Sequence, residues 1–296
     1  MANKQDKVLG LFILGAFFVF FIIIFLLLFG LSSTSDIELA GTGDKVAVIE
    51  LDGIITSSEN IVNQFRRYQK DNSIHAIILH INSPGGGIAA SQEIYESVKR
   101  ARETKPVIAS MESVAASGGY YVALGTDSIM ANPGTTTGSI GVIAEFPNFT
   151  GLLEKLGISM TVIKSGRFKD TGTPYRDMTP ADREYLQAWI DDGYEQFVSA
   201  VALERDMPTY EVRRLADGRV YSGQQAYELG LIDSLGTFRD AVQLAADIAG
   251  IEGEPRLIRQ ERKRLTPFKL IFAFDVKEFI GRHFSAWPRI QYLMSF

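Results

Sequence analysis

Val8 to Leu31 form an unbroken run of 24 uncharged residues near the N-terminus, and Phe, Ile and Leu dominate it. At 1.5 Å rise per residue, a helix of this length crosses a hydrocarbon core of roughly 30 Å. A cleaved secretion signal is the competing interpretation, but its apolar part spans only about 7–15 residues and ends in small residues. Ser32 to Ser35 offer only a weak site of that kind. The run therefore predicts one transmembrane helix over residues 8–31.

The charges beside this run predict how the chain is oriented in the membrane. Lys4 and Lys7 precede it, whereas Asp36 and Glu38 follow it. Positively charged flanks stay in the cytoplasm. We therefore expect residues 1–7 to be cytoplasmic, with a single pass through the cytoplasmic (inner) membrane. The remaining chain, about 265 residues, is then extracytoplasmic or periplasmic.

Composition narrows the functions open to the rest of the chain. The 296 residues carry a formal net charge of −5, so they offer no general basic surface for nucleic acid. Cysteine is absent, which excludes disulfides and a cysteine nucleophile. The three histidines, His75, His80 and His283, are too few for a dense histidine metal centre.

A strand–helix alternation begins after a polar tether at residues 32–44, and it predicts an α/β domain with a mostly parallel sheet. Short β-branched runs predict strands at 45–51, 74–81, 107–110 and 128–131. Helical patterns follow at 59–69, 89–102, 118–124, 180–205, 210–215, 223–229 and 238–249. The long helix should begin at an N-cap, Thr179, and bury Leu186, Trp189, Ile190, Phe197 and Val201. The turns at 82–87 and 112–117 should lie at the carboxyl ends of strands, where open α/β folds carry their chemistry.

The C-terminal segment 253–296 differs from the rest. Between Pro255 and Phe296 there are nine Lys or Arg and three acids, so this part carries +6. Aromatic residues lie among the basic ones, which fits a membrane surface. Packing against a neighbouring subunit, or partial disorder, fits equally well.

Three segments of small residues could carry chemistry. Consecutive glycines in Asn82–Gly87 would let backbone N–H groups approach a ligand, as an oxyanion hole requires, although a tight turn explains them equally. Ser117, in Val114–Tyr121, would lie at a helix N-terminus, whose field favours an alkoxide-like nucleophile, although a plain N-cap is the simpler explanation. Ser139 lies between glycines and could equally be turn chemistry. The histidines flank a buried strand or lie in the tail, so a lysine of lowered pKa is the more plausible base.

Four strings in this order, SPGGG, AASGGYY, TGSIGV and KSGRFKD, resemble the signal peptide peptidase SppA family in its short, single-domain form. The resemblance extends from about Val46 to Gly236. It implies a ClpP/crotonase-like fold of repeated strand-strand-helix units over residues 45–252. It also implies a membrane-anchored serine endopeptidase that degrades remnant signal peptides and other apolar peptides, without a cofactor.

The resemblance assigns roles to individual residues. It implies that Ser117 is the nucleophile and that Lys169, not Lys164, is the general base. Backbone N–H groups of Gly86 and Gly118 would form the oxyanion hole. Ser139 would orient the lysine.

The family also implies how copies of the chain assemble. Its longer members carry two tandem domain copies, with serine and lysine in different halves. A single-copy chain would therefore share each site between neighbouring protomers of a closed homo-oligomeric ring.

Two other functions remain open at this point. A crotonase-type enzyme acting on acyl-CoA thioesters would also use the glycine-rich turn. A membrane-tethered scaffold would have the same fold without turnover. Neither rival predicts covalent modification of Ser117 by a serine-reactive fluorophosphonate.

Overall fold

The computed structural model describes residues 15, 17–20, 37–39, 43–260 and 291–293 of the chain. Within these ranges, no helix combines the length and the apolar composition needed to cross a membrane. The cytoplasmic segment predicted at 1–7 lies outside the described residues, and so does most of the transmembrane helix predicted at 8–31.

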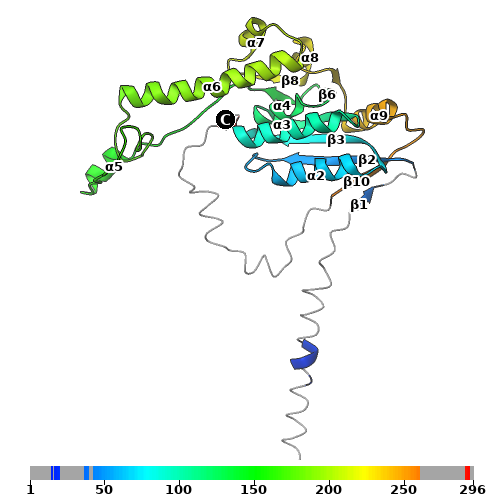
Figure 1. Ribbon diagram of the computed structural model, residues 1–296, viewed down its shortest axis with the longest axis horizontal. Coiled ribbons are helices and arrows are strands. Elements are labelled where there is room, and N and C mark those ends of the chain that lie inside the picture. The colour runs from blue at the N-terminus through cyan, green and yellow to red at the C-terminus, as the bar shows by residue number, and fades with distance from the viewer. Residues whose placement is uncertain (1–14, 16, 21–36, 40–42, 261–290, 294–296) are drawn as a thin grey trace, which may run out of the picture.

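A largely parallel sheet forms the centre of the body (Figure 1). Its main path runs β1 (Ile37–Leu39), β10 (Arg256–Arg259), β2 (Lys45–Asp52), β3 (Ile74–Ser83), β5 (Val107–Ala116), β6 (Ser128–Ala131) and β9 (Ser234–Leu235). Only the β1–β10 pairing along this path of described strands is antiparallel. β7 (Thr136–Gly138) pairs in parallel with the end of β5, and β8 (Val220–Ser222) pairs antiparallel with β7.

Helices cover both faces of this sheet. Alternate residues of a strand point to opposite faces, so Ala47 and Ile49 join one apolar core while Val46 and Val48 join the other. The first core contains residues of α2 (Glu59–Lys70), α3 (Ile88–Arg102) and α4 (Gly118–Ala123). The second lies under α9 (Phe238–Ala249). The α/β prediction is therefore confirmed.

The second half of the body is helical, as predicted. α6 (Pro180–Glu204) begins at a capping box in which the Thr179 and Asp182 side chains bind each other's backbone N–H. α7 (Thr209–Leu215) and α8 (Gly223–Glu228) follow it. Leu186, Phe197 and Val201 of α6 are buried, as predicted. Ile190 is only half-buried, and the prediction for Trp189 was wrong, because that residue is 43% exposed. The N-terminal half of α6 extends beyond the body, where the sheet no longer covers it (Figure 1).

Residues 143–179, which we call the arm, project from the body together with this half of α6 (Figure 1). The arm contains one short helix, α5 (Thr150–Lys155). Several of its large apolar side chains are exposed in the single chain, among them Leu152, Leu156, Ile158, Met160, Val162 and Ile163.

Three strands lie outside the predicted domain boundaries. β1 belongs to the predicted tether, and β10 belongs to the predicted tail, where it lies between β1 and β2. A third strand, β11 (Gln291–Leu293), pairs antiparallel with β4 (Gly85–Gly87) of the glycine-rich turn. The sheet of the body therefore extends past residue 252. The rest of the tail, 261–290 and 294–296, lies outside the described residues.

Candidate active site

Ser117 has the most unusual backbone near the carboxyl edge of the sheet. It follows β5 directly and precedes α4, with φ of 52° and ψ of −117°. A non-glycine residue rarely adopts this conformation, and such strain persists where surrounding contacts maintain it. The Ser117 N–H donates to the Gly138 carbonyl at 2.7 Å, and its carbonyl accepts from the Tyr121 N–H at 2.8 Å. These two bonds hold a sharp strand-to-helix turn with the serine at its apex.

The Ser117 hydroxyl is buried and has no hydrogen-bond partner among the described residues. A buried hydroxyl is normally paired, so an unpaired one at a strained turn indicates a functional group. It lies at the start of α4, where unpaired backbone N–H groups favour negative charge. The turn predicted at 112–117 is shorter than expected, because residues 112–116 continue β5.

Ser139 lies beside Ser117. β5 and β7 run parallel and end at the pair Ala116 and Gly138, so the next residue of each strand is a serine. Ser139 also has a positive φ, 51°, and its N–H donates to the Arg219 carbonyl at 2.8 Å. The predicted nucleophile and the predicted lysine-orienting residue therefore occupy matching positions on adjacent strands.

The glycine-rich turn packs against the first turn of α4. Ser83 Oγ donates to the Gly53 carbonyl at 2.6 Å and accepts from the Gly85 N–H at 3.2 Å, which fixes the start of the turn. A Cβ on Gly119 would lie 2.8 Å from the Ser83 carbonyl oxygen. Only glycine allows this approach, which brings the turn close to Gly118 and the nucleophile.

Gly86 contacts a different segment on each side. On one side, the Gly85 carbonyl accepts from the Ile55 N–H and the Gly87 N–H donates to the Ile55 carbonyl, both at 2.8 Å. Backbone groups of successive residues in a strand point to opposite sides. The Gly86 N–H therefore points away from Ile55, toward β11, where Tyr292 lies opposite it in the ladder. The N–H predicted for the oxyanion hole thus faces the backbone of another strand.

Lys169 lies in the arm, and its side chain is exposed. Its backbone N–H donates to the Gly166 carbonyl at 3.2 Å, which closes a turn. No hydrogen bond or ion pair joins its side chain to another described residue. The structure brings Ser117, Gly86, Gly118 and Ser139 together in the body, whereas Lys169 lies in the arm (Figure 1) and its side chain bonds to none of them.

Ser139 lines an open cavity of about 630 Å³. Ile190 and Tyr194 of α6 line one side of it, and Val220 of β8 lines another. A group that enters this cavity can approach Ser139 from outside the chain.

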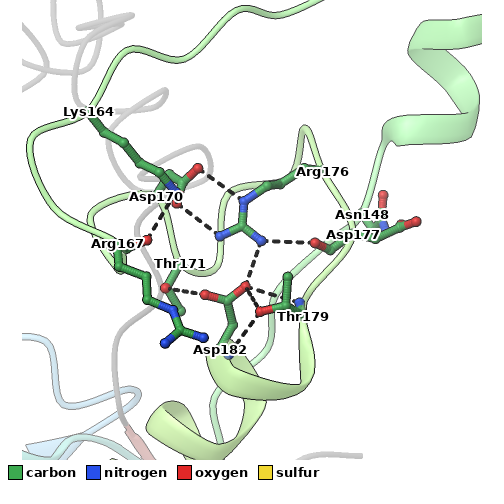
Figure 2. Close-up of polar contacts among 9 residues, drawn as sticks. All are labelled: Asn148, Lys164, Arg167, Asp170, Thr171, Arg176, Asp177, Thr179 and Asp182. Carbon is green, nitrogen blue, oxygen red and sulfur yellow. Dashed lines mark hydrogen bonds and ion pairs between the residues drawn. The ribbon is translucent and has the colours of Figure 1, made fainter.

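A cluster of charged residues holds the turn that carries Lys169 (Figure 2). Hydrogen bonds from Arg176, and to a smaller extent from Lys164, hold the pKa of the Asp170 carboxyl well below its usual range. Arg176 also binds Asp182, and this bond, with one from Thr171, lowers the pKa of the Asp182 carboxyl. No sequence motif predicts this cluster, because its members lie at irregular spacing in a loop. The one available signal was the acid three residues into α6, Asp182.

Two family models match overlapping parts of the chain. Residues 99–252 match peptidase family S49, and residues 45–136 match Clp protease. "Putative protease slr0021" of Synechocystis is 47% identical over 71% of this chain and 76% of its own length. "Putative signal peptide peptidase SppA" of Enterococcus faecium is 36% identical over 70% of this chain and 64% of its own.

A plant relative is longer than this chain. "Serine protease SPPA, chloroplastic" of Arabidopsis thaliana is 34% identical over 72% of this chain but only 35% of its own length. The match to the family covers more than half of the 296 residues, and the first of these relatives is matched over three quarters of its length. The chain therefore belongs to peptidase family S49, as its resemblance to the signal peptide peptidases predicted.

Proposed function

We propose that this S49 peptidase is a membrane-anchored serine endopeptidase with a Ser117–Lys169 dyad. Its substrates are remnant signal peptides and other apolar peptides at the extracytoplasmic face of the membrane. The observation that carries the proposal is Ser117 itself, a strained residue at the start of α4 whose buried hydroxyl is unpaired within the described chain.

The proposed reaction uses the residues that the family resemblance assigns. Neutral Lys169 accepts the Ser117 proton as Oγ attacks the peptide carbonyl, and Ser139 orients the lysine. The N–H groups of Gly86 and Gly118 stabilise the oxyanion of the tetrahedral intermediate. Its collapse expels the amine with the proton from Lys169 and leaves an acyl-enzyme, which a water activated by Lys169 then hydrolyses. This sequence requires neither a metal ion nor an organic cofactor.

The substrate backbone binds as an added strand. β11 demonstrates that the side of β4 turned away from Ile55 accepts an extended, antiparallel segment. α4, which starts next to Ser117, contacts both β4 and β11. A peptide in this register would place a carbonyl near the Gly86 N–H, and main-chain bonds give such binding affinity with little dependence on sequence.

Serine and lysine come from neighbouring protomers of a closed ring. Two observations support this arrangement: the Lys169 side chain is exposed on a projecting arm, and the Ser117 hydroxyl has no hydrogen-bond partner in the described chain. The cavity at Ser139 provides the space through which a neighbour's lysine could enter. The exposed apolar residues of the arm would be covered in the same contact.

Residues 8–31 anchor the enzyme in lipid, with residues 1–7 in the cytoplasm. The charge asymmetry of Lys4 and Lys7 against Asp36 and Glu38 supports this orientation. In sealed vesicles, protease on the cytoplasmic face should leave the body intact, and protease on the other face should digest it.

Labelling by a fluorophosphonate, together with peptide hydrolysis, tests the dyad. The wild type should be labelled at Ser117, and Ser117→Ala should not be. Lys169→Ala should lose peptidase activity without unfolding, because the side chain is exposed. Lys169→Arg should be nearly as inactive, because a guanidinium stays protonated and accepts no proton.

Two outcomes would contradict the proposal. An unlabelled wild type would favour a scaffold of the same fold. An active Lys169→Arg protein would show that another group is the base.

A further inference from the structure

The backbone of Lys169 is held in place on both sides, although its side chain makes no hydrogen bond or ion pair with another described residue. The preceding residue, Phe168, stacks on Tyr185 of α6, with ring centroids 5.1 Å apart and an angle of 22° between the rings. The following residue, Asp170, accepts hydrogen bonds from Arg176 Nε at 3.0 Å and Nη2 at 2.9 Å. The lysine therefore projects from a turn that is tied to a long helix at two points.

Arg176 connects this turn to the first turn of α6 (Figure 2). Its Nη1 donates to Asp182 Oδ2 at 2.6 Å and to the Asp177 carbonyl at 2.9 Å. Asp182, with a side chain only 4% exposed, is the capping-box acid of α6. Thr171 Oγ1 donates to its other oxygen at 2.7 Å. The planar guanidinium joins two carboxylates at once, a geometry that a lysine ammonium does not reproduce.

Lys164 and Arg176 also determine what the Asp170 carboxylate can bind. Asp170 is adjacent to the proposed base and its side chain is 10% exposed. Lys164 and Arg176 Nη2 occupy Oδ1, and Arg176 Nε occupies Oδ2. With both oxygens engaged by cations, the carboxylate does not form an ion pair with Lys169.

We propose that Asp170, Arg176 and Lys164 are positioning residues for Lys169, which fix its turn on α6 and keep the adjacent carboxylate away from its amine. This inference rests on the proposed function, in which Lys169 is the base. Without the two cations, Asp170 would favour the protonated lysine, which cannot accept the serine's proton. The other charged groups of the turn and of the first two turns of α6 are Arg167, Asp177, Asp182, Arg183 and Glu184.

The test is Arg176→Gln in the full-length protein. Because a small misplacement of a catalytic group costs up to about 100-fold in rate, we expect kcat for a peptide substrate to fall at least about tenfold, with KM little changed. In the plot of kcat/KM against pH, the midpoint of the acidic limb should also shift to higher pH by roughly half to one unit, because an uncompensated carboxylate near the base favours its protonated form. A purely structural role would not move that limb.

Arg213→Gln is the matched control. Arg213 makes the same kind of two-point bond, to Glu195 of α6, but it touches neither the turn nor the body's serines. Its kcat and pH profile should equal those of the wild type. If Arg176→Gln also keeps the wild-type kcat and pH profile, the positioning role is wrong.

Lys164→Met is a second test that remains valid if Arg176→Gln unfolds the arm. It removes one cation from Asp170 and leaves the Arg176 bonds to α6. The midpoint of the acidic limb should therefore shift to higher pH, while the melting temperature stays near that of the wild type. An unmoved limb in this variant would overturn the charge-balancing part of the proposal. Lys169→Ala separates the two levels of inference: if that variant remains active, the proposed base is wrong, whatever Arg176 does.

Discussion

At the scale of single residues, the backbone of the candidate nucleophile is strained. Ser117 holds a φ of 52°, a region that costs a non-glycine residue on the order of 1–3 kcal/mol. Alanine in its place would carry the same strain, because the strain comes from Cβ and not from the hydroxyl. Glycine would not, because it has no Cβ.

Ser117→Gly should therefore be more stable than Ser117→Ala, although both should be inactive. Glycine also increases the conformational entropy of the unfolded chain, which offsets part of this gain. We therefore expect a difference of about 1 kcal/mol in the free energy of unfolding. Denaturant unfolding of the two variants measures it. Ser110, buried within β5, provides the control, since glycine there should be less stable than alanine. Equal stabilities at position 117 would contradict the strain argument.

At the scale of the elements, the tail strand β11 occupies the edge of β4 that the proposed substrate would use. Tyr292 lies opposite Gly86, whose N–H is the proposed oxyanion donor. A segment attached to the same protein competes with free peptide at a high effective concentration. β11 should therefore act as a competitor for the substrate.

Tyr292→Pro in the full-length chain tests this competition, because proline donates no backbone hydrogen bond and weakens strand pairing. We expect KM for a peptide substrate to fall severalfold while kcat stays the same. A chain ending at Ile290 should behave likewise, and a synthetic peptide of residues 291–296 should inhibit it competitively. An unchanged KM in both proteins would show that β11 does not block substrate.

The elements also show where prediction from sequence works. The strands and helices of the α/β alternation were predictable because their apolar residues recur with a strand or helix period over many positions. The start of α6 at Thr179 was predictable from local capping chemistry. By contrast, β10 and β11 are short and depend on partners about 200 residues away in sequence, Lys45–Val48 and Gly85–Gly87. Their local sequence carries no sign of that pairing.

Some residues of the candidate site were likewise predictable from sequence, and others were not. Ser117 and Ser139 were identified from motifs, and the parallel pairing of β5 and β7 explains why they lie together. The role of Arg176 had no motif, because an arginine in a loop is usually solvated. Only the folded arm shows that it joins Asp170 to Asp182.

At the scale of the whole molecule, two features of the single chain are explained if neighbouring copies share each site, as proposed. The arm exposes apolar side chains that soluble proteins normally cover, such as Ile163, which is 97% exposed. The Ser117 hydroxyl also has no hydrogen-bond partner among the described residues. A heterologous, head-to-tail contact repeated around a closed ring would remedy both.

Mixing two inactive proteins tests this assembly. Ser117→Ala and Lys169→Ala should each be inactive alone. In a random co-assembly of equal amounts, a junction works when its serine comes from the lysine mutant and its lysine from the serine mutant. Each condition holds for half of the subunits, so about a quarter of the sites should recover activity. A mixture of Ser117→Ala with the double mutant Ser117→Ala/Lys169→Ala is the control, and it should stay inactive because no subunit supplies a serine. If the first mixture is demonstrably co-assembled and shows no more activity than its parts, serine and lysine act within one chain, and the arm would have to fold back onto its own body.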